Sequence, residues 1–69
     1  MKFVELNNLL KAKGLASTGG QAKIMIRSGK VLVNGDAETR VRRKLVPGDR
    51  VEAAGQQFTV REEECRQSK

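Results

Sequence analysis

The feature that most constrains this chain is a short apolar run that ends in an Asn-Gly pair. The run is Val31-Leu32-Val33, and Asn34-Gly35 follows it directly. Asn and Gly tolerate the positive φ angles of a type I′ turn, whose twist matches that of two antiparallel strands. The pattern therefore predicts a β-hairpin near the middle of the chain, and any fold proposed for it must contain an antiparallel sheet.

Two segments ahead of this hairpin have helical spacing. Apolar residues recur at intervals of three and four from Phe3 to Lys13, and a glycine then follows. Thr18 and Gln21 form a capping-box pattern that starts a second helix, and Gly29 ends it. The first half of the chain is thus predicted to form two consecutive helices.

The segments after the hairpin predict further short strands. The stretch from Glu38 to Val46 is too charged for a central strand, and the Pro-Gly-Asp sequence at 47–49 predicts a turn. Residues 50–54 and 57–61 have the composition of two short strands. The order of elements predicts an α+β fold, in which two N-terminal helices pack on a small, mostly antiparallel β-sheet.

The C-terminal residues differ from the rest in composition. Three glutamates stand in a row there, and apolar side chains are too few to pack. We therefore expect a single domain over residues 1–61, followed by a flexible acidic tail over residues 62–69. Cys65 lies in this tail after the glutamates, which disfavour its thiolate, so it is expected to be an exposed and inert thiol.

Composition excludes several classes of function. The chain has 69 residues, no His and a single Cys, so it offers neither a Cys-His pair nor the usual His/Cys metal ligands. We expect no enzymatic activity, no cofactor, no metal and no small-molecule substrate. No apolar run approaches the roughly 18 residues of a membrane span. With one Cys there is no internal disulfide, so a cytoplasmic protein without a membrane partner is expected.

The charge of the chain is basic and crowded at one place. The formal net charge is +6, and four cations fall within five positions, at Arg40, Arg42, Arg43 and Lys44. Composition alone leaves two interpretations open, a surface for a polyanion or cations that only keep a small domain soluble. The crowding favours the polyanion, because four cations so close together repel one another and a bound polyanion would offset this repulsion.

Three blocks of sequence occur in a defined order: LASTGGQAK at residues 15–23, IRSGKVLVNG at 26–35 and VPGDRV at 46–51. Together they resemble the S-four-type RNA-binding domain, the alpha-L motif named for the fourth small-subunit ribosomal protein. The resemblance covers about Leu6 to Val60. It is greatest for the small bacterial subfamily in which this domain is the entire protein, and it implies the alpha-L fold and a function in RNA binding.

The resemblance also implies which residues contact RNA, because in this family the second helix and the following hairpin loop present basic side chains to it. The implied RNA-binding residues are Lys23, Arg27, Lys30, Arg40, Arg42, Arg43 and Lys44, extended by Lys11 and Lys13. Alternatively, Lys11 and Lys13 are plain helix-end cations favoured by the helix dipole. Many members carry an Arg where this chain has Gly19, and backbone amides at the helix start are the expected substitute.

These observations predict a non-catalytic protein that binds structured RNA, either ribosomal RNA or a tRNA-like RNA, with ribosomal particles as further partners. The chain has no Trp or Tyr for base stacking and both Phe are expected to be structural, so recognition by shape and backbone is favoured. The alternative is a protein-interaction module that uses its basic face on an acidic partner, with Ile24 and the acidic tail as contact points. Salt-dependent binding to folded RNA but not to acidic protein separates the two.

Overall fold

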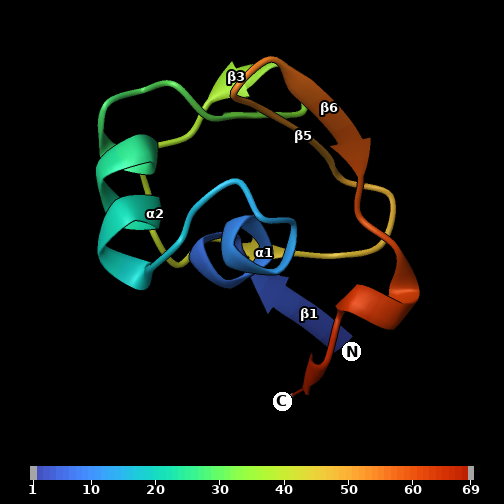
Figure 1. Cartoon of the computed structure of the whole chain (residues 1–69). Coiled ribbons are helices and arrows are strands. Elements are labelled where there is room, and N and C mark those ends of the chain that lie inside the picture. Colours follow the sequence, from blue (N-terminus) through green and yellow to red (C-terminus); the bar gives the residue numbers. More distant parts are fainter. Residues whose placement is uncertain (1, 69) are drawn as a thin grey trace.

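The computed structural model describes residues 2–68 and has the expected α+β class (Figure 1). Its helices in that range are α1 (Leu6–Ala12), α2 (Gly19–Arg27) and a short 3-10 helix, η1 (Glu62–Glu64). Its strands are β1 (Lys2–Glu5), β2 (Leu32–Val33), β3 (Asp36–Ala37), β4 (Lys44–Leu45), β5 (Arg50–Ala53), β6 (Gln56–Thr59) and β7 (Gln67–Ser68). They form two small antiparallel sheets rather than one, with the orders β4-β1-β7 and β3-β2-β5-β6.

The first helix begins later than predicted, at Leu6 instead of Phe3. The residues before it form β1, which lies between β4 and β7, with Val4 opposite Leu45 and Phe3 opposite Gln67. Pairing with strands far along the chain therefore overrides the helical spacing of the apolar side chains.

The second helix begins with the predicted cap. The Thr18 hydroxyl accepts a hydrogen bond from the Gln21 amide at 3.1 Å. The Gln21 side chain accepts from the Ser17 amide at 2.6 Å, one residue earlier than a capping box requires. The helix ends before Gly29, whose φ of 80° suits glycine and stops the helix as predicted.

The Asn-Gly hairpin forms as predicted. Asn34 and Gly35 have φ angles of 53° and 87°, the positive values that a type I′ turn requires. Strands β2 and β3 flank this turn, and β5 and β6 complete the sheet. The charged stretch 38–46 contributes only β4, which lies at the edge of the other sheet, in agreement with its composition.

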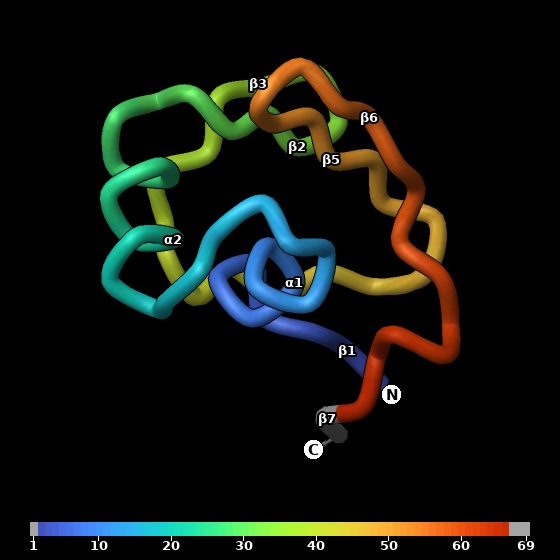
Figure 2. Tube along the Cα trace, in the orientation of Figure 1, coloured from blue at the N-terminus to red at the C-terminus, as the bar shows by residue number. Residues whose placement is uncertain are grey.

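Helix α1 lies at the centre of the fold in the view of Figure 2, with the rest of the chain running around it. Its residues Leu6, Leu9 and Leu10 are almost fully buried, and α2 contributes Ala22 and Ile26. The other buried apolar residues are Val4, Ala16, Val31, Val33, Leu45, Val51, Ala53, Val60 and Cys65. Within the described part of the chain, no helix has the length and apolar character needed to cross a bilayer.

The C-terminal segment is attached to the fold at three points, and the expectation that it lacks packing is wrong. Cys65 is buried in the core, β7 pairs with β1, and Glu64 forms an ion pair with Lys13. The low number of apolar side chains does not predict these contacts, because one buried thiol and one strand pairing are enough to attach a short segment. The expectation that the Cys65 thiol is exposed is therefore wrong as well. Because burial raises the pKa of this thiol, we still expect it to be unreactive. Flexibility of the tail stays a prediction, and Lys69 lies outside the described residues.

Candidate nucleic-acid interface

Four of the predicted cations line one open hollow on the surface, of about 520 Å³: Arg40, Arg42, Arg43 and Lys44. We call this surface the basic hollow. Hydrogen bonds fix its backbone at both ends, because the Glu38 amide donates to the Val31 carbonyl and the Leu6 amide donates to the Arg43 carbonyl, each at 2.9 Å. The cations therefore project from a segment that is tied to Val31, just before β2, and to the start of α1.

A buried carboxylate lies beside the basic hollow. Glu38 is only 6% exposed, and its two oxygens accept from Arg40 Nε at 3.0 Å, Arg40 Nη2 at 3.1 Å and Arg43 Nη1 at 2.6 Å. It also accepts from the Arg40 amide at 2.9 Å. Hydrogen bonds from Arg40, and next from Arg43, lower the pKa of the Glu38 carboxyl from 4.5 to about 2. One carboxylate thus offsets one of two guanidinium charges, and the group of three retains a positive charge.

A second carboxylate holds another arginine of the hollow. Arg42 Nε donates to Glu5 Oε2 at 3.0 Å, from the end of β1. The side chains of Arg42 and Arg40 nevertheless remain 76% and 73% exposed, whereas that of Arg43 is 31% exposed. Arg40 and Arg42 are therefore both oriented by a carboxylate and accessible to a ligand.

Lys44 is placed by an aromatic ring. Its ammonium lies 4.9 Å from the centre of the Phe3 ring, a cation–π contact, and the residue remains exposed. Phe58 packs against the core and lies 5.1 Å from the Lys13 ammonium. Phe58 therefore has the structural role expected from the sequence, whereas the ring of Phe3 contacts Lys44 of the basic hollow.

Helix α2 carries a second group of predicted cations, Lys23 and Arg27, and Lys30 follows the helix. All three are exposed, and among residues 2–68 no carboxylate forms an ion pair with them. Ile24 lies beside Lys23 and is 71% exposed. We call Lys23, Arg27 and Lys30 the α2 cations.

The backbone around the α2 cations lies near segments that carry other predicted residues. Lys30 precedes Val31, whose carbonyl accepts from the Glu38 amide, so it adjoins the segment that carries the basic hollow. Between β3 and β4 the chain passes behind α2 in the view of Figure 1. The Lys11 ammonium lies 4.0 Å from the position that a Cβ on Gly19 would occupy, at the start of α2.

Lys13 has a different environment from the other predicted cations. Its ammonium pairs with Glu64 and lies over Phe58, so it faces the C-terminal segment. Lys11 and Lys13, predicted as one extension of the RNA surface, are thus separated by the structure: Lys11 lies near α2, and Lys13 holds the C-terminal segment.

Two carboxylates organise the arginines of the hollow, and neither is predicted from the sequence. Glu38 lies two residues before Arg40 within a run that is otherwise basic, and this proximity was a usable signal. Glu5 is separated from Arg42 by 37 positions, so no local pattern connects them. Four cations therefore line the hollow, and two acids beside it hold three of them.

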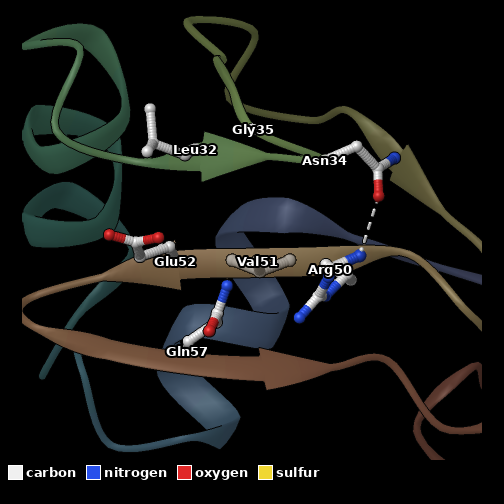
Figure 3. Close-up of a pocket in the computed structure, with 7 residues that line it drawn as sticks. All are labelled: Leu32, Asn34, Gly35, Arg50, Val51, Glu52 and Gln57. Carbon is white, nitrogen blue, oxygen red and sulfur yellow. Dashed lines mark hydrogen bonds between the residues drawn. The ribbon is translucent and has the colours of Figure 1, made fainter.

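A further pocket lies on the outer face of the second sheet (Figure 3). It is lined by Leu32, Asn34, Gly35, Arg50, Val51, Glu52 and Gln57, and the Arg50 amide donates to Asn34 Oδ1 at 3.0 Å. Arg50 and Glu52 carry opposite charges on neighbouring positions of this face. The pocket therefore lacks the positive charge that a polyanion site needs, in contrast to the basic hollow.

A family profile, two relatives and a solved structure all match this chain. The profile of the S4 domain matches residues 1–61. The chain is 49% identical over 57 residues to "Putative RNA-binding protein YbcJ" of Escherichia coli (strain K12), which covers 83% of this chain and 81% of that protein. A YbcJ protein of Shigella flexneri, named as uncharacterized, matches to the same extent. The solution structure of E. coli YbcJ, described as revealing an alfaL motif involved in RNA-binding, has a TM-score of 0.66 and 46% identity. The match covers 88% of this chain and 77% of the chain in that structure.

Proposed function

Because the chain belongs to the S4 domain family, we propose that it is a non-catalytic RNA-binding protein that recognises structured RNA through the basic hollow and the α2 cations. The observation that carries the proposal is the basic hollow itself. Four cations line one open surface there, and two of their guanidiniums are ordered yet largely exposed. The description of E. coli YbcJ as carrying a motif involved in RNA-binding supports the same function.

The chemistry of these residues suits a phosphate backbone. A guanidinium offers five N–H donors in a planar fork that matches phosphate oxygens, and a lysine ammonium neutralises phosphate as a compact charge. The chain has no Trp or Tyr, and its two Phe are occupied by contacts with Lys44 and Lys13. Neither ring is therefore available as an aromatic stacking platform for unpaired bases, and recognition of folded RNA by its shape and backbone is favoured.

Ribosomal RNA or a tRNA-like RNA, bound in the cytoplasm and within ribosomal particles, is the target class we propose. The support for this finer assignment is the resemblance to a ribosomal protein domain and the basic charge of the chain. Lys13 is left out of the proposed surface because its ammonium faces the C-terminal segment, between Glu64 and Phe58, rather than α2 or the basic hollow.

A second candidate function is protein binding, with an acidic protein on the same basic face. The observation that favours it is Ile24, which is 71% exposed beside Lys23 and offers an apolar contact. An acidic polypeptide and an RNA differ in a measurable way, because only the RNA presents phosphates in the spacing of a folded backbone.

The experiment that tests the proposal is fluorescence anisotropy with a labelled RNA hairpin, competed by unlabelled hairpin, by single-stranded oligouridine of equal length or by polyglutamate. We expect hairpin to compete best and polyglutamate poorly, and we expect affinity to fall steeply with salt as counterions are released. Arg42→Gln should weaken binding, whereas Arg50→Gln, with the same charge change outside the proposed surface, should not. Equal competition by polyglutamate would favour the acidic-partner function instead.

A further inference from the structure

The position of Glu38 is unexpected for a surface that binds a polyanion. Its carboxylate is negatively charged, almost fully buried and in direct contact with two arginines of the basic hollow. If affinity for RNA depended only on the sum of charges, this acid would weaken binding. A role for Glu38 in binding must therefore come from geometry rather than from charge.

The contact with Arg40 has the geometry of an orienting clamp. Two of the five N–H donors of Arg40 point to Glu38, one from Nε and one from Nη2, and they reach both carboxylate oxygens. Such a bidentate contact fixes the plane of the guanidinium. Three N–H donors of this side chain remain, and the side chain is 73% exposed, so these donors lie on the accessible side of a fixed group.

We propose that Glu38 is a positioning residue for RNA binding, which holds the Arg40 guanidinium so that its three remaining N–H donors meet the phosphates of the ligand. This inference rests on the proposed function. Arg43 takes part as the partner that keeps the buried carboxylate in place, through its 2.6 Å contact with Oε1. Because the pKa of Glu38 is lowered to about 2, the carboxylate is ionised at every pH at which RNA binding is normally measured.

The energetic reason is the entropy of a long side chain. An unrestrained arginine loses its rotamer freedom when it binds a phosphate, and this loss opposes binding. Glu38 makes Arg40 lose that freedom on folding, before RNA arrives. The negative charge that it adds is offset by Arg43. The proposal requires the gain from ordering Arg40 to exceed the electrostatic cost that remains.

The test uses Glu38→Gln, which keeps the shape of the side chain and raises the net charge by one. The matched control is Glu52→Gln, which makes the same charge change on the outer face of the second sheet. We expect Glu38→Gln to bind the labelled RNA hairpin at least about threefold more weakly than the wild type, although its net charge is more positive. Glu52→Gln should bind as tightly as the wild type or slightly more tightly.

A double-mutant cycle distinguishes positioning from a general structural effect. Arg40→Ala is measured in the wild type and in Glu38→Gln. If Glu38 acts through Arg40, the loss of affinity caused by Arg40→Ala is smaller in the Glu38→Gln background. Additive losses would mean that Glu38 acts elsewhere, and would overturn the proposal.

If circular dichroism shows that Glu38→Gln is unfolded, Arg40→Lys provides the test, because this exposed position keeps its charge and loses the bidentate fork. We expect Arg40→Lys to bind the hairpin more weakly, and unchanged binding would overturn the positioning role. Tight binding of the hairpin by the wild type, with equal or tighter binding by folded Glu38→Gln, would overturn this inference alone. A wild type that does not bind RNA would overturn the proposed function as well.

Discussion

Among the single residues, Glu38 and Glu5 decide how the arginines of the hollow are presented. Each carboxylate accepts from an arginine whose side chain remains largely exposed. In both contacts the carboxylate is largely covered and the arginine is exposed, with side-chain exposures of 12% for Glu5 and 76% for Arg42. Because an exposed partner weakens an ion pair, we interpret the Arg42–Glu5 contact as orienting a cation more than as stabilising the fold. Glu38 differs in having two arginine partners, which together keep its carboxyl ionised.

The lowered pKa of Glu38 predicts how stability depends on pH. The folded protein favours the ionised carboxyl, with a pKa of about 2 against 4.5 ordinarily. The stability that Glu38 contributes is therefore fully present above about pH 4.5 and is lost as pH falls toward 2. We expect the urea midpoint of the wild type to fall across this window more steeply than that of Glu38→Gln.

Glu52→Gln is the control for this experiment, since it removes an exposed acid for which no contact with an arginine is seen among the described residues. Its urea midpoint should follow that of the wild type through the same pH range. Parallel curves for the wild type and Glu38→Gln would contradict the assignment of the acid sensitivity to Glu38.

How much of the site is predictable from the sequence depends on the distance between partners. The crowding of Arg40, Arg42, Arg43 and Lys44 is visible in the sequence, and the structure places these four cations around one hollow. The contact between Glu5 and a residue 37 positions later requires knowledge of how β1 pairs with β4. The sequence therefore identifies the cations but not the carboxylates that orient them.

Two glycines at opposite ends of α2 illustrate how an element depends on backbone conformation. A Cβ on Gly20 would meet the Thr18 hydroxyl at 3.8 Å, an ordinary contact, whereas Gly29 has a φ of 80° that other residues rarely adopt. We expect Gly20→Ala to raise the free energy of unfolding by about 0.5–1 kcal/mol, because alanine has less freedom in the unfolded chain. Gly29→Ala should lower it by about 1 kcal/mol.

Thermal melts of the two variants measure this difference directly. The change is the same in both, one added methyl group, so only the backbone conformation of the site distinguishes them. Melting temperatures that move in the same direction would contradict the described start and end of α2.

The C-terminal segment provides a second test among the elements. Deletion of residues 62–69 removes β7, the buried Cys65 and the Glu64 partner of Lys13. We expect the free energy of unfolding to fall by about 2 kcal/mol or more, measured by urea denaturation. Cys65→Ala, which keeps β7, should cause only part of that loss. An unchanged stability after deletion would support a domain boundary at residue 61.

The elements that the sequence predicts correctly are those defined by neighbouring residues. The hairpin follows from Asn34-Gly35, and the start of α2 follows from Thr18 and Gln21. The elements that it misses, β1 and β7, are strands that exist only through long-range pairing, because β1 pairs with β4 on one side and with β7 on the other. Their pairing joins distant parts of the chain, and residue spacing within either strand does not reveal it.

For the whole molecule, we propose that the position of the cations, and not only the net charge, governs RNA binding. The net charge of +6 would attract any polyanion, and cations also occur away from the proposed surface, for example at Arg50 and Arg66. Lys23 and Arg27 on α2 can therefore be compared with Arg50 and Arg66 as pairs of equal charge.

The most direct measurement is the salt dependence of hairpin affinity for the wild type, for Lys23→Gln/Arg27→Gln and for Arg50→Gln/Arg66→Gln. Each phosphate contact that is lost should reduce the log–log slope by about 0.7 to 0.9. We predict that the slope falls for the α2 pair and stays at the wild-type value for the control pair. Equal reductions in the two variants would show that overall charge governs binding, and would contradict a defined RNA surface on this fold.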